Sequence, residues 1–136
     1  MAEKRTQSAL LEEQGNRLIQ SEPLLRHVKN SKAKIMYLES DAKRKRGRDK
    51  LVYGQCEKVS PKNRWAITAD FLIVLYAPNI EGLNEKQIEI LLFHELLHIG
   101  VEEQEDGTED YYLRNHDVEE FEEILAAYGK NWSSKV

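Results

Sequence analysis

Residues 84–100 read NEKQIEILLFHELLHIG and are the most informative stretch of the chain. Their apolar residues recur at helical spacing, and Asn84 and Gln87 stand where the two partners of a capping box are found. We therefore expect a helix that begins after Asn84 and buries a wide apolar face. Gly100 follows the last apolar residue and is expected to end this helix.

The polar residues of this predicted helix have the spacing of a metal site. His94 and His98 are four positions apart, so both imidazoles project from one face and can reach a single ion. Zinc takes three or four such ligands, and a catalytic site leaves one position to water. Glu95 can reach that water and take its proton as a general base. The alternative, two core histidines with Glu95 at the surface, leaves three polar groups in an apolar segment to be explained separately.

A third ligand has to come from farther along the chain. His116 is the one histidine after the motif, and we expect it to complete a site for one zinc ion per chain. Asp117 is a candidate to orient a metal ligand through a hydrogen bond, or to bind the metal in place of His116. Glu119 and Glu120 are competing oxygen ligands, and the acid-rich stretch 102–110 is an open source of a fourth.

Two related metal-site patterns are excluded. A metzincin needs glycine at position 101 and histidine at 104, where this chain has Val101 and Gln104. Gln104 also argues against the longer three-histidine pattern of a bacterial metal-dependent endoribonuclease family. His27 lies far from the motif in sequence, and we expect no role for it at the metal.

The rest of the chain indicates an α+β fold with a small three-stranded sheet. We expect N-terminal helices within residues 1–33, strands near 34–38, 51–59 and 65–76, surface loops at 41–50 and 102–110, and a C-terminal helix over 116–128. In the strongest strand, 65–76, alternate residues face opposite sides of the sheet, and Pro78 ends it. The whole of 1–136 is read as one domain, with a core over 34–129 and a tail at 130–136.

Composition narrows the class of protein. The chain has 136 residues, of which 40% are hydrophobic and 32% charged, and a single cysteine, Cys56. It has no run of 18 apolar residues and no apolar leader, so we expect no membrane partner and a cytoplasmic location in a bacterial or phage-infected cell.

Charge is distributed unevenly along the chain. Residues 1–64 carry a balance of +8 and residues 65–136 a balance of −12. The densest cationic run comprises Lys43, Arg44, Lys45, Arg46 and Arg48. It is a candidate to contact nucleic acid or another anionic partner; the alternatives are a solvated loop, or two halves that neutralise each other.

Several segments resemble a known family, the putative phage metallopeptidases, a group of minimal zincins. They are His94–Ile99, Arg114–Phe121, Tyr128-Gly129 and Trp65–Phe71, and the resemblance spans roughly residues 34–129. It implies a zincin-like fold, His94, His98 and His116 as ligands, Glu95 as the base, and a peptide or protein as substrate. It also implies that the 65–76 strand borders the cleft and pairs with an extended peptide.

Three classes of function follow from these observations. The leading one is a zinc-dependent peptidase or amide hydrolase, with Tyr111, Tyr112 and Arg114 as candidates by position for stabilising an oxyanion. The second is a non-catalytic phage or host interaction protein in which zinc only holds the fold. The third is a nucleic-acid-associated protease that uses the basic run at 43–48.

Overall fold

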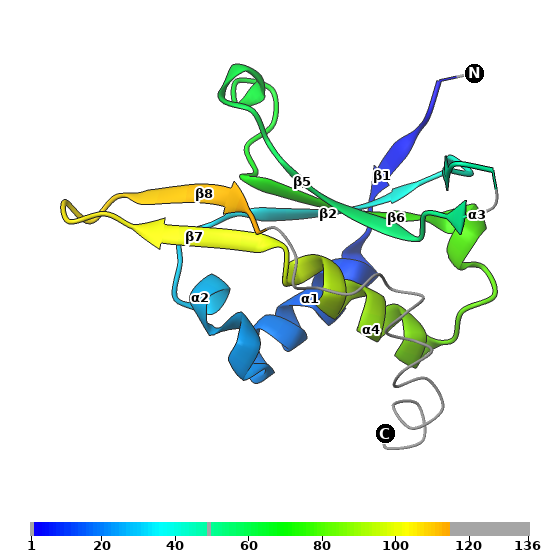
Figure 1. Cartoon of the computed structure of the whole chain (residues 1–136), viewed down its shortest axis with the longest axis horizontal. Helices are drawn as coiled ribbons and strands as arrows, with labels where there is room; N and C mark the ends of the chain where they lie inside the picture. The colour runs from blue at the N-terminus through cyan, green and yellow to red at the C-terminus, as the bar shows by residue number, and fades with distance from the viewer. Residues whose placement is uncertain (1, 49, 115–136) are drawn as a thin grey trace.

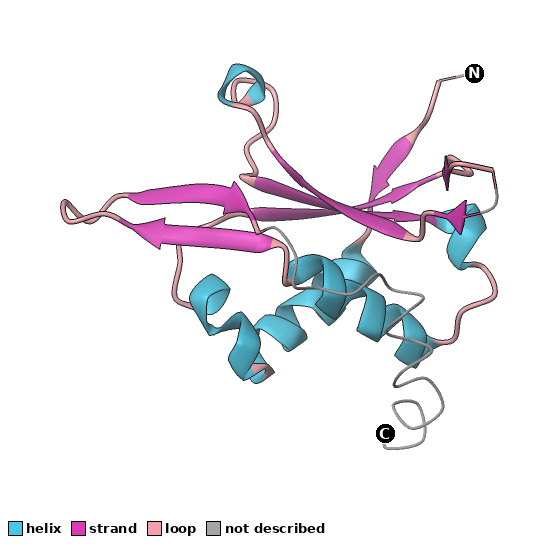
Figure 2. Ribbon diagram, viewed as in Figure 1, coloured by secondary structure: helices cyan, strands magenta, loops and turns pink. Residues whose placement is uncertain are grey.

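The structure is a computed structural model that describes residues 2–48 and 50–114. Its helices are α1 (Ala9–Ser21), α2 (Arg26–Lys29), α3 (Ala77–Ile80) and α4 (Glu85–Leu96), with 3-10 turns η1 (Pro23–Leu25) and η2 (Pro61–Asn63). Its strands are β1 (Arg5–Gln7), β2 (Ile35–Ser40), β3 (Lys45–Arg46), β4 (Lys50–Leu51), β5 (Gly54–Lys58), β6 (Phe71–Tyr76), β7 (Ile99–Glu103) and β8 (Glu109–Leu113). Figure 2 shows how they divide the molecule between helices and strands.

A sheet and a layer of helices make up the body of the molecule. The main sheet has the order β1-β2-β6-β5, in which β2 and β6 are parallel and the other pairs antiparallel. Helices α1, α2 and α4 lie on one side of it (Figure 1). The α+β class is confirmed, but the expected three strands are one too few. The extra strand, β1, is three polar residues long, so no apolar periodicity marks it.

The central strand β6 is buried on both faces. Phe71, Ile73 and Leu75 pack in the core shared with the helices, while Leu72 and Val74 pack in a second cluster on the opposite face. Packing against both faces of the strand explains its unbroken apolar run.

Two expectations about this strand are wrong. Residues 65–70 form turns and a bend rather than strand, and Trp65 is 88% exposed. The strand also cannot pair with an extended peptide, because β6 is already paired with β2 and β5. The pattern of side chains predicts which residues share a face of the sheet, but it does not distinguish an internal strand from an edge strand. The edge on this side of the sheet is β5.

Both segments expected to be loops contain hairpins. β3 and β4 pair within 41–51, and β7 and β8 pair across the acidic stretch. Gly47 and Gly107 have φ values of 71° and 86°, which lets the chain reverse in each turn. Charged residues are tolerated there because the ribbons project from the body of the molecule, as Figure 1 shows for β7 and β8.

The N-terminal helices form as expected, with shifted boundaries. Ser8 caps α1 by accepting a hydrogen bond from the Leu11 amide. Helix α1 ends at Ser21, and the chain continues through η1 into α2. The predicted helix 116–128 and tail 130–136 lie outside the described residues. Within the described part, no helix is both long and apolar enough to cross a membrane.

Candidate metal centre

Helix α4 carries the site, and its start is fixed as the sequence predicts. The Asn84 side chain accepts a hydrogen bond from the Gln87 amide at 2.9 Å, and the Gln87 side chain accepts one from the Asn84 amide at 2.9 Å. This capping box satisfies two amide groups that the first turn leaves without helical partners. Ile90, Leu91 and Leu92 are buried and hold the helix against the core.

The end of α4 differs from the prediction. The helix ends at Leu96, with Leu97 as its C-cap, and Gly100 lies in β7. A Cβ atom on Gly100 would lie 2.4 Å from the ring of Tyr112, so close cross-strand packing explains this glycine. His98 therefore follows the helix and does not lie within it.

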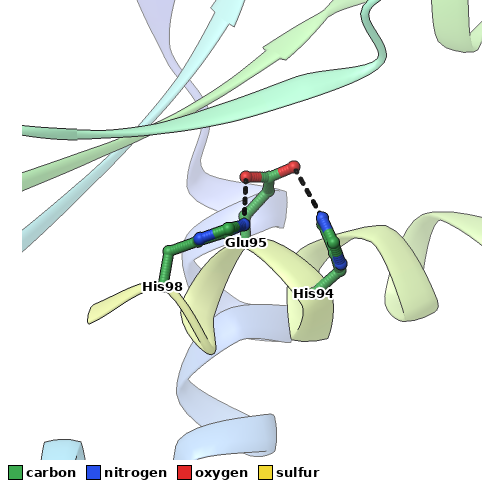
Figure 3. Close-up of side chains that lie close together, drawn as sticks. All are labelled: His94, Glu95 and His98. Carbon is green, nitrogen blue, oxygen red and sulfur yellow. Dashed lines mark ion pairs between the residues drawn. The ribbon is translucent and has the colours of Figure 1, made fainter. Parts of the chain in front are cut away.

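The three polar residues of the motif converge at the C-terminal end of α4 (Figure 3). The Glu95 carboxylate lies between the two imidazoles: Oε2 is 4.0 Å from His94 Nε2, and Oε1 is 4.0 Å from His98 Nε2. The imidazole rings are 5.0 Å apart and nearly perpendicular, at 86°. His94 and Glu95 are buried, and the His98 side chain is 14% exposed. Glu95 is thus not the surface residue that the alternative interpretation required.

The donor set fits a zinc ion. One ligand atom from each residue lies within 4.8 Å of the other two. Two nitrogens that share a tetrahedral zinc at about 2.0 Å lie roughly 3.3 Å apart, so small side-chain rotations suffice. Two imidazoles and a carboxylate are also the donor types that zinc accepts. Among the described residues, this is the one such cluster of three or more histidine, cysteine and acidic side chains.

Burial changes the acidity of Glu95. Loss of solvent around the carboxylate raises its pKa to about 8, and the positive charge of Arg46 opposes this with a smaller effect. A carboxyl group with such a pKa exchanges protons near neutral pH, which suits a general base. The contribution of Arg46 also brings the predicted cationic run into electrostatic contact with the site.

Strand β5 borders the site. A Cβ atom on Gly54, the first residue of β5, would lie 2.7 Å from Leu75 Cδ2 and 3.4 Å from Glu95 Cγ. Absence of a side chain therefore lets the edge strand approach the Glu95 carboxylate. An isolated glycine in a strand signals such an approach, but the sequence does not say to which partner.

Backbone contacts tie the chain after β8 to the motif. The Arg114 amide donates to the His98 carbonyl at 2.6 Å, and His98 Nδ1 lies 3.4 Å from the Arg114 carbonyl. His27, expected to be unrelated to the metal, also has a structural partner, since its Nε2 lies 2.8 Å from the Ile99 carbonyl. That contact joins α2 to β7 beside the site.

The other predicted site residues are not part of the described His94-Glu95-His98 cluster. His116 and Asp117, with Glu119 and Glu120, lie outside the described residues. Of the oxyanion candidates, Tyr111 donates its hydroxyl to Glu109 Oε1 at 2.7 Å, and Tyr112 covers Gly100. Gln104 lies between β7 and β8, and its side-chain amide donates to Asp110 Oδ2 at 2.7 Å.

Comparison with known proteins gives one match. The model of the family described as "putative phage metallopeptidase" matches residues 4–136, nearly the whole chain. No curated protein and no solved structure matches the chain significantly. The family description agrees with a metal-binding His-Glu-His cluster at the end of α4. The chain therefore belongs to the putative phage metallopeptidase family.

Proposed function

We propose that this chain is a zinc-dependent peptidase in which His94 and His98 bind the metal and Glu95 is the general base. The observation that carries the proposal is the convergence of these three side chains within 4.8 Å in a largely buried position. Family membership supports the reaction class.

His116 is proposed as the third ligand, and the backbone near His98 supports it. Arg114 is hydrogen-bonded to His98 through its amide. His116 is two residues farther on, and two residues span at most about 7 Å. His116 is therefore near enough along the chain to be proposed as the third ligand, and Asp117, one residue farther on, is the alternative. A His116→Ala variant should bind zinc more weakly than Asp117→Asn, and the reverse order would transfer the role to Asp117.

The chemistry follows from the environment of Glu95. A zinc ion held here would supply a water of lowered pKa and polarise a substrate carbonyl. Glu95 would take a proton from the attacking water and pass it to the leaving amine, as a base and then an acid. Burial favours both steps, because it keeps bulk water from competing for the carboxylate.

A peptide substrate is supported by the position of β5. This strand is the edge of the sheet nearest Glu95, and Gly54 leaves its start without a side chain. An extended peptide that pairs with β5 would place its backbone beside the site. The same role, implied by resemblance for residues 65–76, is not available to the internal strand β6.

The test compares wild type with Glu95→Gln on a quenched fluorescent peptide library and on unfolded casein. Both proteins are loaded with zinc, and metal content is measured in parallel. We expect the variant to keep its zinc and lose at least about 100-fold in kcat/KM, the usual lower range for removal of a general base. Equal activity in the two proteins would refute the role of Glu95.

A structural zinc is the second candidate function. It predicts that wild type, loaded with one zinc per chain, cleaves no peptide of the library. In that case Glu95→Gln would change only stability, and the protein would act through binding.

A further inference from the structure

The cationic run predicted as a loop forms a two-stranded ribbon, which we call the basic hairpin (residues 43–48, 50 and 51). Its base is clamped by Asn79, whose side-chain amide donates to the carbonyls of Arg44 at 2.8 Å and Val52 at 2.7 Å. The Val52 amide adds a bond to the Arg44 carbonyl at 3.0 Å. A buried side chain, Asn79, thus holds the two strands together where they leave the body of the molecule.

Arg44 anchors the hairpin to the sheet. Its guanidinium donates to the Tyr76 hydroxyl at 3.0 Å and lies 5.8 Å from the centre of that ring. The Tyr76 hydroxyl in turn donates to Gln55 Oε1 at 3.1 Å. Arg44 therefore anchors the hairpin to β5 and β6, and its charge is engaged within the fold.

The remaining cations are exposed and spread over both faces of the ribbon. They are Lys43, Lys45, Arg46, Arg48 and Lys50. Arg46 lies directly opposite Lys50 in the register, and Lys45 lies opposite Leu51. Side chains alternate between the faces of a strand, so positive charge is presented on each side. A ribbon with cations on both faces is suited to lie between two rows of anions.

The chemistry of the hairpin favours a phosphate backbone over a protein partner. Protein interfaces have an apolar centre, whereas duplex nucleic acid is bound mainly through cations at its phosphates. Within the described residues, the large exposed hydrophobic side chains are Leu10, Leu24, Trp65, Tyr112 and Leu113, and none belongs to the hairpin. The hairpin also contains no aromatic residue on which an unpaired base could stack.

Among the described residues, the acidic β7–β8 hairpin lies away from the basic hairpin (Figure 1). Glu102, Glu103, Glu109 and Asp110 lie on the β7–β8 hairpin. Figure 1 shows that hairpin at one end of the molecule, while residues 45–51 lie at the other end beside α3. The two hairpins therefore present charges of opposite sign at different ends of the described structure (Figure 1).

We propose that the basic hairpin binds double-stranded nucleic acid through its phosphates, with Asn79 and Arg44 holding the ribbon in place. A two-stranded ribbon is narrow enough for the major groove of DNA, where it meets phosphates on both walls. Because the contacts are to phosphates, binding should be independent of sequence. The hairpin contains none of the proposed metal ligands, and the variant tested below keeps Arg46, whose charge acts on Glu95, so the DNA-binding proposal is tested separately from the peptidase activity.

The test measures fluorescence anisotropy of a labelled 20-base-pair DNA duplex with the full chain at 50–200 mM NaCl. With at most five phosphate contacts, affinity should fall by up to about 500-fold over this range. The variant Lys45→Gln/Arg48→Gln/Lys50→Gln keeps the anchor Arg44 and leaves two of the five cations, Lys43 and Arg46. Its affinity should therefore fall only about 10-fold over the same range. A second duplex of unrelated sequence should bind equally well.

The matched control removes the same charge elsewhere. Arg17, Arg26 and Lys29 are exposed on α1 and α2, and their triple replacement by glutamine should leave the salt dependence of wild type unchanged. An equal loss in this control, or no duplex binding by wild type at 50 mM NaCl, would overturn the proposal. Displacement of the duplex by polyglutamate at equal charge concentration would also overturn it and assign the surface to acidic proteins. Circular dichroism of each variant verifies that it is folded.

Discussion

The burial of Glu95 predicts an unusual dependence of stability on pH in the metal-free protein. The folded state holds the proton of Glu95 up to a pKa of about 8, against an ordinary value of 4.5. The unfolded chain releases that proton near its ordinary value. Between these two pH values unfolding releases a proton, so the free energy of unfolding falls as pH rises and levels off above 8. Replacement of Glu95 by glutamine, which carries no titrating proton, removes this contribution.

The expected size of the effect follows from the two pKa values. Raising the pKa from 4.5 to about 8 corresponds to roughly 4–5 kcal/mol. The side chain is 6% exposed, so screening by solvent reduces this little. Glu95→Gln should therefore match wild type near pH 4.5 and be more stable by up to about 4 kcal/mol at pH 9.

Urea denaturation with a chelator present, followed by circular dichroism at pH 5, 7 and 9, measures this difference. His94 and His98 are common to both proteins, so subtracting the two profiles isolates Glu95. Glu89→Gln on the same helix is the matched control, because Glu89 is a part-exposed carboxylate paired with Lys86 at 3.4 Å. Its effect should stay below about 1 kcal/mol at each pH. A Glu95→Gln difference that stays constant from pH 5 to 9 would refute a buried, protonated Glu95.

Three further substitutions test how the site is supported, each by urea denaturation. Asn84→Ala removes the cap of α4 and should cost about 1 kcal/mol, whereas Asn84→Ser should restore most of it; equal stability of Asn84→Ala and wild type would contradict the capping role. Gly100→Ala pushes a methyl group into the Tyr112 ring and should lower the free energy of unfolding by about 1–3 kcal/mol. Adding Tyr112→Ala should relieve part of this loss, whereas strictly additive effects of the two substitutions would rule out the contact. Asn79→Ala removes both amide bonds to the basic hairpin and should cost about 1–3 kcal/mol, with faster amide exchange in residues 43–52; unchanged exchange would show that the clamp is unimportant.

The local features of α4 could be predicted from sequence because they depend on near neighbours. The capping box needs only Asn84 and Gln87, and the approach of His94 to His98, which lies just after the helix, needs only their four-residue spacing. The predicted end of the helix at Gly100 is wrong because it depends on a residue that is distant in the sequence. Gly100 matches a C-terminal signal, but its role is set by Tyr112, twelve residues away on the partner strand.

The position of β6 within the main sheet also could not be predicted from the sequence. The alternation in β6 is consistent with an internal strand or an edge strand, and pairing with both β2 and β5 decides between them. Short polar strands such as β3 and β4 carry no periodic signal, so the cationic run was predicted as a loop. The approach of Gly54 to Glu95 joins residues 41 positions apart and depends on the whole sheet.

The most direct test of the central claim is the zinc content of the purified, untagged protein, measured by mass spectrometry of the metal after dialysis. We expect one zinc per chain in wild type and in Glu95→Gln, and none in His94→Ala or His98→Ala. Each variant is examined by circular dichroism, so that loss of metal is separated from loss of fold. Absence of zinc from folded wild type, with no rise in Tm on adding the metal, would contradict the metal centre.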